Sequence, residues 1–321
     1  MPRILVLGGT GYVGSAFVQE LQLRGWDYRI LRRSEVDYSQ FPVLLRFLRS
    51  ERFDLLVNCA GYSGKPNVDG CELERADTLL GNATLPLTLA CACSEAGIPW
   101  GHVSSGCIFS GAKVRNPDGT VRVERDLMTP RVQEELVQFP ERFHGFTEAD
   151  EPNFSFRNGP CSFYSGSKAL GEEVLLNHSG HFVWRLRIPF NSVDQSRNYL
   201  SKVQRYSKVY DNVNSISHLG DFARVCLDLW EKRAAFGTYN VVNPGWVTTR
   251  KVVSRIQAVL TPGRQYEFWR DDSEFYAQAA KTPRSNCILD VSKLLATGVK
   301  IRSVDEAIED SLLHWKPAPQ A

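Results

Sequence analysis

Tyr164 and Lys168 are four residues apart in the segment FYSGSKALGEE. On a helix, this spacing places both side chains on the same face. A tyrosine can donate a proton to the oxygen of a carbonyl that is being reduced, and a neighbouring ammonium stabilises the phenolate that remains. Ser105 can hydrogen-bond the same substrate oxygen. These residues predict carbonyl reduction, with Tyr164, Lys168 and Ser105 as the catalytic residues; the pair alone also fits a surface helix without chemistry.

A glycine-rich turn, GGTGYVG at residues 8–14, follows a short apolar run and precedes a helical pattern. Gly8 permits a tight turn, Gly11 lets the backbone approach a pyrophosphate, and Gly14 lets the helix pack close to the strand. The N–H groups and the positive dipole of the helix N-terminus suit phosphates. The turn predicts a dinucleotide site, the alternative being a purely structural turn. The expected cofactor-binding residues are Gly8, Thr10, Gly11, Tyr12, Val13 and Gly14.

Arg32 and Arg33 follow the second apolar run, where a site specific for NAD usually has an acidic residue for the ribose 2′-hydroxyl. Guanidinium groups suit a 2′-phosphate instead. The two arginines therefore predict NADP(H) as the cofactor. The alternative is that both are solvated surface charges.

Short apolar runs alternate with helical patterns along most of the chain. We expect strands at 3–7, 28–31, 54–58, 102–109, 182–190 and 238–242. We expect helices at 12–24, 39–50, 73–96, 163–177, 218–232, 248–260 and 303–314. This alternation predicts an α/β fold, a Rossmann-type doubly wound parallel sheet with a smaller C-terminal substrate-binding lobe packed over its carboxyl edge.

The expected domain organisation places residues 1–190 in the nucleotide-binding domain, to which a segment near 218–245 returns. Residues 191–321 form mainly the substrate-binding lobe. Residues 110–160 carry Gly, Pro, Asn and mixed charge, with one helical patch near 130–138. We interpret about 110–145 as a long surface insertion.

Composition excludes several classes of protein. The 321 residues include 38 Lys and Arg against 36 Asp and Glu, so a net charge of +2 gives no reason to expect nucleic acid or a membrane as a partner. No apolar run reaches the roughly 18 residues of a membrane span, and the N-terminus does not read as a secretion signal. The 8 cysteines form no CxxC pair or metal-ligand cluster. They predict a cytoplasmic protein with reduced thiols and no metal.

These features together resemble the extended short-chain dehydrogenases/reductases. Asn58-Cys59-Ala60-Gly61 resembles the turn after that family's third strand, and Asn82 resembles the Asn of its following helix. Pro189 is similar to the residue next to the nicotinamide, the other interpretation being a plain strand terminator. The resemblance therefore adds Asn58, Ala60, Gly61, Asn82 and Pro189 to the expected cofactor-binding residues.

Seven segments narrow the resemblance to the nucleotide-rhamnose 3,5-epimerase/4-reductases of plants and large viruses, and more distantly to dTDP-4-dehydrorhamnose reductase. They are residues 61–72, 104–109, 146–154, 162–168, 196–209, 239–245 and 282–290. The resemblance implies NADPH-dependent reduction of the C4 ketone of a nucleotide-linked 4-keto-6-deoxyhexose, with inversion at C3 and C5. The product is a 6-deoxy-L-sugar nucleotide such as NDP-L-rhamnose, and the partner is a nucleotide-diphosphate sugar.

Inversion beside a ketone needs one group that removes a proton and another that returns one on the opposite face. Cys107 lies two residues after Ser105, so strand alternation directs both side chains to the same side. By resemblance, Cys107 and Lys202 match the Cys and Lys assigned to this work; the reductase relatives have no Cys there. A buried, inert thiol is the other interpretation of Cys107.

Further substrate-binding residues are expected in two loops. Lys65, Asn67 and Asp69 follow the third strand, at the edge where ligands of α/β proteins bind. Arg284 matches a position that relatives use for the nucleotide diphosphate.

Two alternative functions remain open, a 4-ketoreductase without epimerase activity and a nucleotide-sensing protein without turnover. Proteins of the second kind typically lose the Tyr or the Lys. Residues 111–145 form a longer segment than the resemblance implies before the helix of Tyr164 and Lys168. The segment is either a lid over the sugar site or a contact surface for another subunit, so the identity of the ketosugar stays undefined. The nucleotide and the oligomeric state, for which a homodimer is one option, are also undefined.

Overall fold

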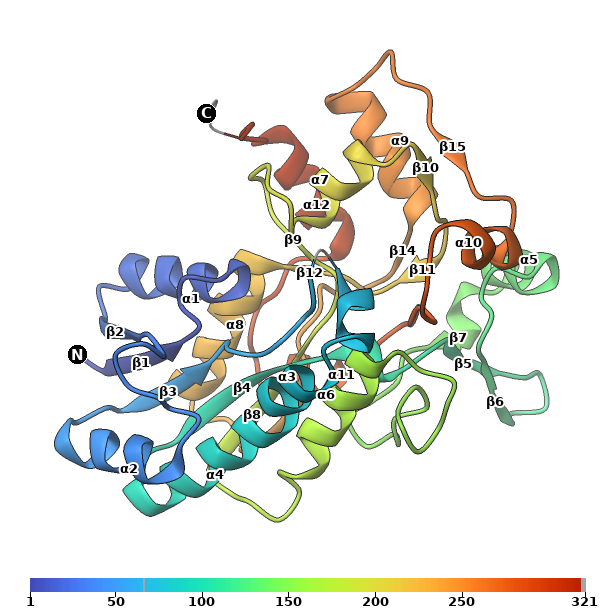
Figure 1. Ribbon diagram of the computed structural model, residues 1–321. Helices are drawn as coiled ribbons and strands as arrows, with labels where there is room; N and C mark the ends of the chain where they lie inside the picture. Colours follow the sequence, from blue (N-terminus) through green and yellow to red (C-terminus); the bar gives the residue numbers. More distant parts are fainter. Residues whose placement is uncertain (66, 319–321) are drawn as a thin grey trace. The chain divides into compact units, whose positions relative to one another are not determined.

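The computed structural model describes residues 1–65 and 67–318, and they form two compact units (Figure 1). Unit 1 consists of Met1–Ile108, Pro152–Arg185 and Cys226–Tyr239. Unit 2 consists of Phe109–Glu151, Leu186–Val225 and the described residues from Asn240 onward. The division differs from the ranges expected from the sequence, because the whole of Phe109–Glu151 belongs to unit 2.

A six-stranded sheet forms the centre of unit 1, with the strand order β13-β8-β4-β3-β1-β2. The strands are β1 (Arg3–Leu7), β2 (Asp27–Leu31), β3 (Leu55–Asn58), β4 (Trp100–Ser105), β8 (His181–Leu186) and β13 (Gly237–Asn240). The pairs β1–β2, β1–β3 and β3–β4 are parallel. The chain leaves β1 toward β2 and later returns to its other side as β3, so the order reverses between β1 and β3. Ligands of such sheets bind at this reversal.

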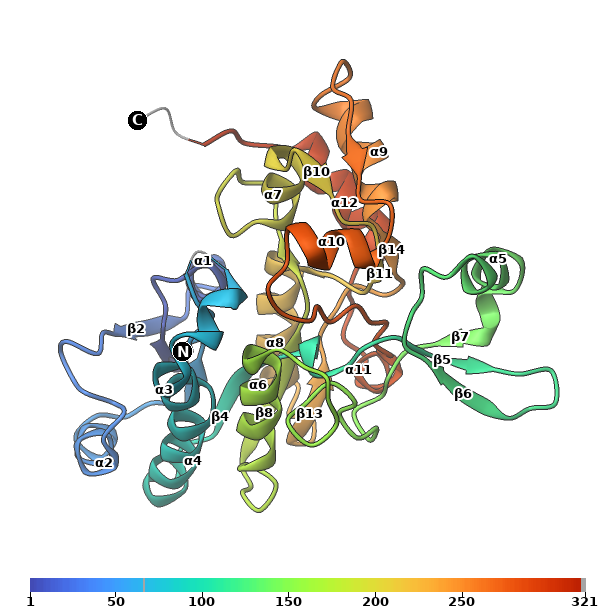
Figure 2. The same ribbon diagram turned by 45° about the vertical axis from the view of Figure 1, so that its right-hand side comes forward.

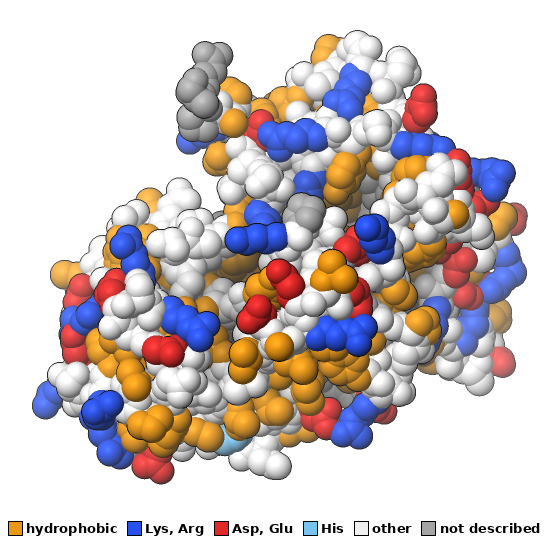
Figure 3. All heavy atoms as spheres, viewed as in Figure 1, with side chains coloured by type: hydrophobic (Ala, Val, Ile, Leu, Met, Phe, Trp, Pro, Cys, Tyr) orange, Lys and Arg blue, Asp and Glu red, His pale blue; other side chains and the backbone are white. Residues whose placement is uncertain are grey.

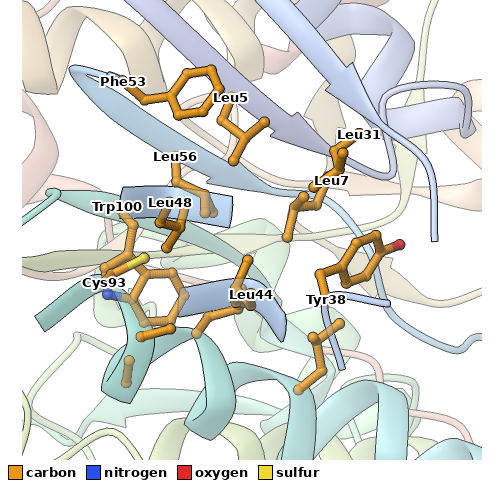
Figure 4. Packing of buried hydrophobic residues seen from close by; sticks show 14 of the residues in the cluster. Leu5, Leu7, Leu31, Tyr38, Leu44, Leu48, Phe53, Leu56, Cys93 and Trp100 are labelled. Atoms are coloured by element: carbon orange, nitrogen blue, oxygen red, sulfur yellow. The ribbon is translucent and has the colours of Figure 1, made fainter. Parts of the chain in front are cut away.

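Helices cover both faces of the sheet, which confirms the doubly wound fold (Figure 1). On one face, α2 (Phe41–Ser50) and α4 (Leu85–Ala96) pack against the apolar strands. Leucines dominate this cluster, which includes Leu5, Leu7, Leu44, Leu48 and Leu56 (Figure 4). On the other face, α1 (Tyr12–Leu23) places Phe17 against Trp184, with ring centroids 5.9 Å apart. Because parallel strands are buried on both faces, they read as continuous apolar runs.

The helix expected over 73–96 is interrupted in the structure. It consists of α3 (Arg75–Leu79), a π turn at Leu80–Thr84, and α4. Pro86 has no N–H to donate to the carbonyl of Asn82, so a regular α-helix cannot continue through this point. Two further helices are α6 (Phe163–Glu173) and α8 (Leu219–Glu231).

Three helices form the core of unit 2, namely α7 (Tyr199–Arg205), α9 (Thr249–Val259) and α12 (Val304–Leu313). Two shorter helices are α10 (Asp272–Gln278) and α11 (Ser292–Ala296). Short strands pair as β9 (Pro189–Phe190) with β12 (Ser217–His218), β11 (Val213–Asn214) with β14 (Val247–Thr248), and β10 (Lys208–Val209) with β15 (Glu267–Phe268). No helix in the described part of the chain is both long and apolar enough to cross a membrane.

The strand expected over 182–190 is also broken. Strand β8 ends at Leu186, and Ile188 has a φ of +35° before β9 begins at Pro189. A β-branched residue with positive φ is strained, so the chain turns here instead of extending the sheet.

The expectation of an insertion with only a helical patch is wrong for residues 111–145, because this region also contains a sheet. Strands β5 (Ala112–Arg115), β6 (Val121–Glu124) and β7 (Phe143–His144) form a three-stranded antiparallel sheet beside helix α5 (Pro130–Gln138) (Figure 2). The buried side chains of this region pack together with Val213 and Ile288. The region is therefore an integral part of unit 2.

Charged side chains are spread over the face seen in Figure 3, where Lys and Arg alternate with Asp and Glu. On this face, neither sign of charge gathers into a single patch.

Candidate active site

The glycine turn between β1 and α1 fits tightly against the loop that follows β3. Gly8 has a φ of +71°, and a Cβ there would lie 2.7 Å from the backbone nitrogen of Ala60. A Cβ on Gly14 would lie 2.1 Å from the carbonyl oxygen of Gly8. The turn is closed by a 3.0 Å hydrogen bond from the N–H of Gly11 to the Gly8 oxygen. Side chains larger than hydrogen are thus excluded at Gly8 and Gly14 by close backbone contacts.

The N-terminus of α1 has the properties of a phosphate site. Its N-cap residue is Gly11, no side chain caps the first turn, and that turn contains no acidic residue. The first N–H groups of the helix and its positive dipole therefore remain available to an anion. Thr10 is exposed, Val13 is half-buried, and the hydroxyl of Tyr12 is buried without a hydrogen-bond partner in the described structure. Burial raises the pKa of Tyr12. The donor set fits a dinucleotide pyrophosphate.

Arg32 and Arg33 lie beside this turn, because Leu31 of β2 is in register with Leu7 of β1. Arg33 is held by Asp37, with 3.1 Å between Nε and Oδ1, and by the hydroxyl of Ser39. Arg32 is exposed, and its side chain forms no ion pair within the described residues. Of the two guanidinium groups, that of Arg32 is the more available to a ligand.

The loop after β3 is fixed by two asparagines. Asn58 is buried, accepts a hydrogen bond from the N–H of Ala60 at 3.0 Å and lies 3.0 Å from Nδ1 of His102. Asn82, in the π turn, accepts from the N–H of Tyr62 and donates to its carbonyl and to the hydroxyl of Ser167. Asn82 thus joins the loop to α6. Its predicted contact with a cofactor, like those of Asn58, Ala60 and Gly61, stays a prediction.

Helix α6 carries Tyr164 and Lys168, and its N-cap is Ser162, whose hydroxyl accepts from the N–H of Ser165. The helix approaches the π turn closely, since a Cβ on Gly171 would lie 2.0 Å from the carbonyl oxygen of Asn82. Tyr164 is half-buried and Lys168 is buried. The ammonium of Lys168 donates a 3.2 Å hydrogen bond to the carbonyl of Val103 in β4. The helix is thereby anchored to the strand that ends at Ser105.

Burial lowers the pKa of Lys168, whereas Cys107, Glu172, Cys59 and Cys71 act in the opposite direction. These four groups are therefore close enough to Lys168 to act electrostatically. Lys168 in turn reinforces the effect of burial, which lowers the pKa of His102 well below its usual value. The ammonium is buried at the junction of α6 and β4.

Cys107 lies near Lys168, but it does not belong to the strand whose alternation was expected to orient it. Strand β4 ends at Ser105, and Gly106–Ile108 forms a 3₁₀ turn, so strand alternation does not extend to Cys107. The N–H of Cys107 donates a 3.2 Å hydrogen bond to the hydroxyl of Ser105. Only 6% of Cys107 is exposed.

A buried network adjoins Lys168, and the sequence alone does not predict it. Glu172 lies one helical turn beyond Lys168 and accepts from the hydroxyl of Ser104 at 2.6 Å. It also accepts from Arg185 of β8, with Nη2 2.8 Å from Oε2 and Nε 3.1 Å from both carboxylate oxygens. The four-residue spacing of Lys168 and Glu172 could have indicated from the sequence that both lie on one face of the helix. The two partners of Glu172 could not be predicted in this way, because Ser104 and Arg185 belong to separate strands.

The remaining predicted residues fall in two places. In unit 1, Asn67 caps a 3₁₀ turn, Val68–Glu72, by accepting from the N–H of Asp69 at 2.8 Å, and Lys65 is exposed. Pro66 lies outside the described residues. Three others, Pro189, Lys202 and Arg284, belong to unit 2.

Within unit 2, Lys202 is half-buried on α7, and burial together with Arg197 lowers its pKa. Arg284 is also half-buried, and it donates to the hydroxyl of Thr282 at 3.0 Å. The structure brings Ser105, Cys107 and Lys168 together in unit 1. Lys202, Arg284 and Pro189 are positioned within unit 2 only.

The chain is similar in sequence to several curated proteins. The bifunctional dTDP-4-dehydrorhamnose 3,5-epimerase/dTDP-4-dehydrorhamnose reductase of Arabidopsis thaliana is 29% identical over 310 residues, covering 95% of this chain and 91% of that protein. A trifunctional UDP-glucose 4,6-dehydratase/UDP-4-keto-6-deoxy-D-glucose 3,5-epimerase/UDP-4-keto-L-rhamnose-reductase of the same plant is 29% identical over 307 residues. This chain spans 41% of the length of that relative.

The fold has a close counterpart among solved structures. The crystal structure of the L780 UDP-rhamnose synthase from Acanthamoeba polyphaga mimivirus matches with a TM-score of 0.81 and 21% identity, covering 98% of this chain and 99% of that one. The model of the RmlD substrate binding domain matches residues 2–316. The resemblance read from the sequence is confirmed, and the chain belongs to the RmlD substrate-binding-domain family.

Proposed function

We propose that the protein is an NADPH-dependent enzyme that inverts C3 and C5 of a nucleotide-linked 4-keto-6-deoxyhexose and reduces its C4 ketone, giving a nucleotide-linked 6-deoxy-L-sugar such as L-rhamnose. The observation that carries the proposal is the anchoring of α6. Lys168 is buried four residues after Tyr164 and bonded to Val103, in the strand that ends at Ser105. The bifunctional relative, matched over 91% of its length, supports the pairing of the two activities.

The residues of this chain perform the reduction by holding and moving one proton. NADPH, when bound, supplies the hydride. The α1 N-terminus and the glycine turn bind its pyrophosphate, and Arg32 binds the 2′-phosphate. Ser105 hydrogen-bonds the ketone oxygen, and Tyr164 donates its phenolic proton to that oxygen as negative charge develops. Lys168 stabilises the resulting phenolate, which requires that Lys168 remain protonated.

The epimerase step uses the acidity of the carbons beside the ketone. Cys107 removes a proton as a thiolate, a form that the nearby Lys168 cation favours, and Lys202 returns a proton on the opposite face. The cytosol is the proposed location, because all eight cysteines are free thiols.

Incubation with UDP- or dTDP-4-keto-6-deoxyglucose and NADPH in D₂O tests the function. NMR of the product is expected to show deuterium at C3 and C5 and an L-configured 6-deoxysugar. Reduction without deuterium at either carbon would leave a 4-ketoreductase and remove the epimerase half. Absence of NADPH oxidation with both substrates would remove the proposal.

Arg32→Ala is expected to raise the KM for NADPH about tenfold or more and to leave the KM for NADH unchanged, because the charge-assisted bonds to the 2′-phosphate are lost. Arg33→Ala is the matched control, with a smaller effect, because Asp37 already holds that guanidinium. Steady-state kinetics with both coenzymes measure this. Equal KM values for NADPH in Arg32→Ala and the unmodified protein would refute the role of Arg32.

Glu172→Gln is expected to shift the alkaline limb of the reduction rate to lower pH. Burial already lowers the pKa of Lys168, and the negative charge of Glu172 counteracts this, so its removal lowers that pKa further. Lys168 then loses its proton at a lower pH, and activity declines earlier. The pH profile of kcat/KM measures the shift. Glu173→Gln, on the exposed side of the helix, is the control and should not move the limb.

A further inference from the structure

Arg187 is a buried arginine that has no acidic partner. Only 5% of its surface is exposed, yet it forms no ion pair with any residue of 1–65 or 67–318. Taking a guanidinium out of water is costly, and proteins normally offset the cost with a carboxylate. A buried arginine without a carboxylate partner therefore points to a counter-ion that the described residues do not supply.

Arg185, two residues earlier, illustrates the usual solution. It is 4% exposed and forms a bidentate ion pair with Glu172. The two arginines are alike in burial and differ in pairing. Among the described residues, the guanidinium of Arg187 donates hydrogen bonds through Nη2 alone, to Oδ1 of Asn214 at 2.6 Å and to the carbonyl of Ser285. Its Nε is buried without a partner, and its Nη1 has none among the described residues.

Further hydrogen bonds fix the backbone of Arg187 and one of the groups that accept from its side chain. Both backbone groups of Arg187 bond to Ser217, with its N–H 3.1 Å from the Ser217 hydroxyl and its carbonyl accepting at 2.7 Å from the Ser217 N–H. The strained residue Ile188 follows directly, with its φ of +35°. Strain of this kind concentrates at functional sites, where the surrounding structure maintains it. Asn214 is oriented in turn by a 3.1 Å hydrogen bond from the N–H of Cys287.

The neighbours of Arg187 add positive charge and hydrogen-bonding groups. Ser285, which accepts from Arg187, follows Arg284 in the chain, so a second guanidinium belongs to the same part of unit 2. Asn214 also donates to Asn286 at 3.0 Å. On α7, burial raises the pKa of Tyr199 while Arg187 acts to lower it, which places the cation close to that helix.

We propose that Arg187 is a ligand-binding residue whose counter-ion is the diphosphate of the nucleotide sugar, bound jointly with Arg284. The assignment rests on the proposed function, which supplies a substrate with this anion. The pyrophosphate of NADPH is accounted for separately by the α1 N-terminus in unit 1. Guanidinium groups suit phosphate oxygens through charge-assisted hydrogen bonds.

Arg187→Met and Arg185→Met form a matched pair that tests the proposal. Arg187→Met removes a buried charge that has no ion-pair partner, so the unfolding midpoint in urea stays unchanged or rises. Arg185→Met leaves Glu172 buried without its ion-pair partner, so the midpoint falls. In calorimetric titrations with UDP and dTDP, Arg187→Met weakens binding of whichever nucleotide the unmodified protein binds by about 30-fold or more. NADPH binding remains unchanged. Arg187→Lys, which keeps the charge and loses the planar fork, gives an intermediate loss.

Three outcomes overturn the proposal. The first is unaltered nucleotide affinity in Arg187→Met. The second is a fall in its urea midpoint as large as that of Arg185→Met. The third is equally tight binding of inorganic phosphate, which would indicate a general anion site. Failure of the proposed function is distinct from these, because it would appear as Arg187-dependent UDP or dTDP binding by a protein that does not oxidise NADPH with either ketosugar.

Discussion

Replacement of Tyr164 by phenylalanine is expected to lower kcat for ketone reduction by about 10²- to 10⁴-fold, the contribution of one general acid. The substitution removes the only proton that this side chain can donate. It keeps the ring, and α6 retains its anchor through Lys168 and Val103. Single-turnover oxidation of NADPH with the 4-ketosugar measures the effect.

The control for this experiment is Tyr28→Phe, which removes a hydroxyl that accepts a hydrogen bond from Gln22 in unit 1. It should keep the rate of the unmodified protein. NADPH affinity should be the same in both variants, because neither hydroxyl belongs to the predicted cofactor contacts. A Tyr164→Phe variant with full turnover would eliminate the tyrosine mechanism, and another proton donor would have to be sought.

Replacement of Cys107 by serine is expected to slow deuterium incorporation at C3 and C5 by at least about 100-fold, because a hydroxyl is a far weaker base than a thiolate at neutral pH. Reduction of a 4-ketosugar that is already epimerised should continue, because Ser105, Tyr164 and Lys168 are unchanged. Proton NMR in D₂O follows the exchange, and NADPH absorbance follows the reduction.

Cys161→Ser is the matched control. Cys161 is half-buried and close enough to Cys107 for the two to interact electrostatically, but it has no proposed role. Exchange should persist in this variant. If Cys107→Ser exchanges as fast as Cys161→Ser, the thiol at residue 107 is a packing residue and the base lies elsewhere.

The central fold could be predicted from the sequence because its signals are local. Glycines at 8 and 14 are required by short contacts within one turn and with one neighbouring loop. The apolar strands β1 and β3 are buried on both faces, so their composition is sufficient to identify them. The helical spacing of Tyr164 and Lys168 depends only on the continuity of α6.

The features that could not be predicted depend on partners distant in the chain. Glu172 bonds with Ser104 and Arg185, which lie on different strands, so its role requires the register of the sheet. The break at Ile188 has no local signal before Pro189, because apolar residues alternate with Arg185 and Arg187 up to that point, as they would along a continuing strand. In β6, two valines alternate with charged residues over only four positions, too short a pattern to distinguish a strand from a loop.

The interleaving of the two units has a practical consequence for how the protein can be shortened. The chain passes from one unit to the other five times, so no single cut separates them. A truncation near residue 190 would remove β13 and leave β8 as a bare sheet edge, ready to pair with other molecules. Such a fragment would tend to aggregate, and the full-length chain is the proper starting material for every experiment on this protein.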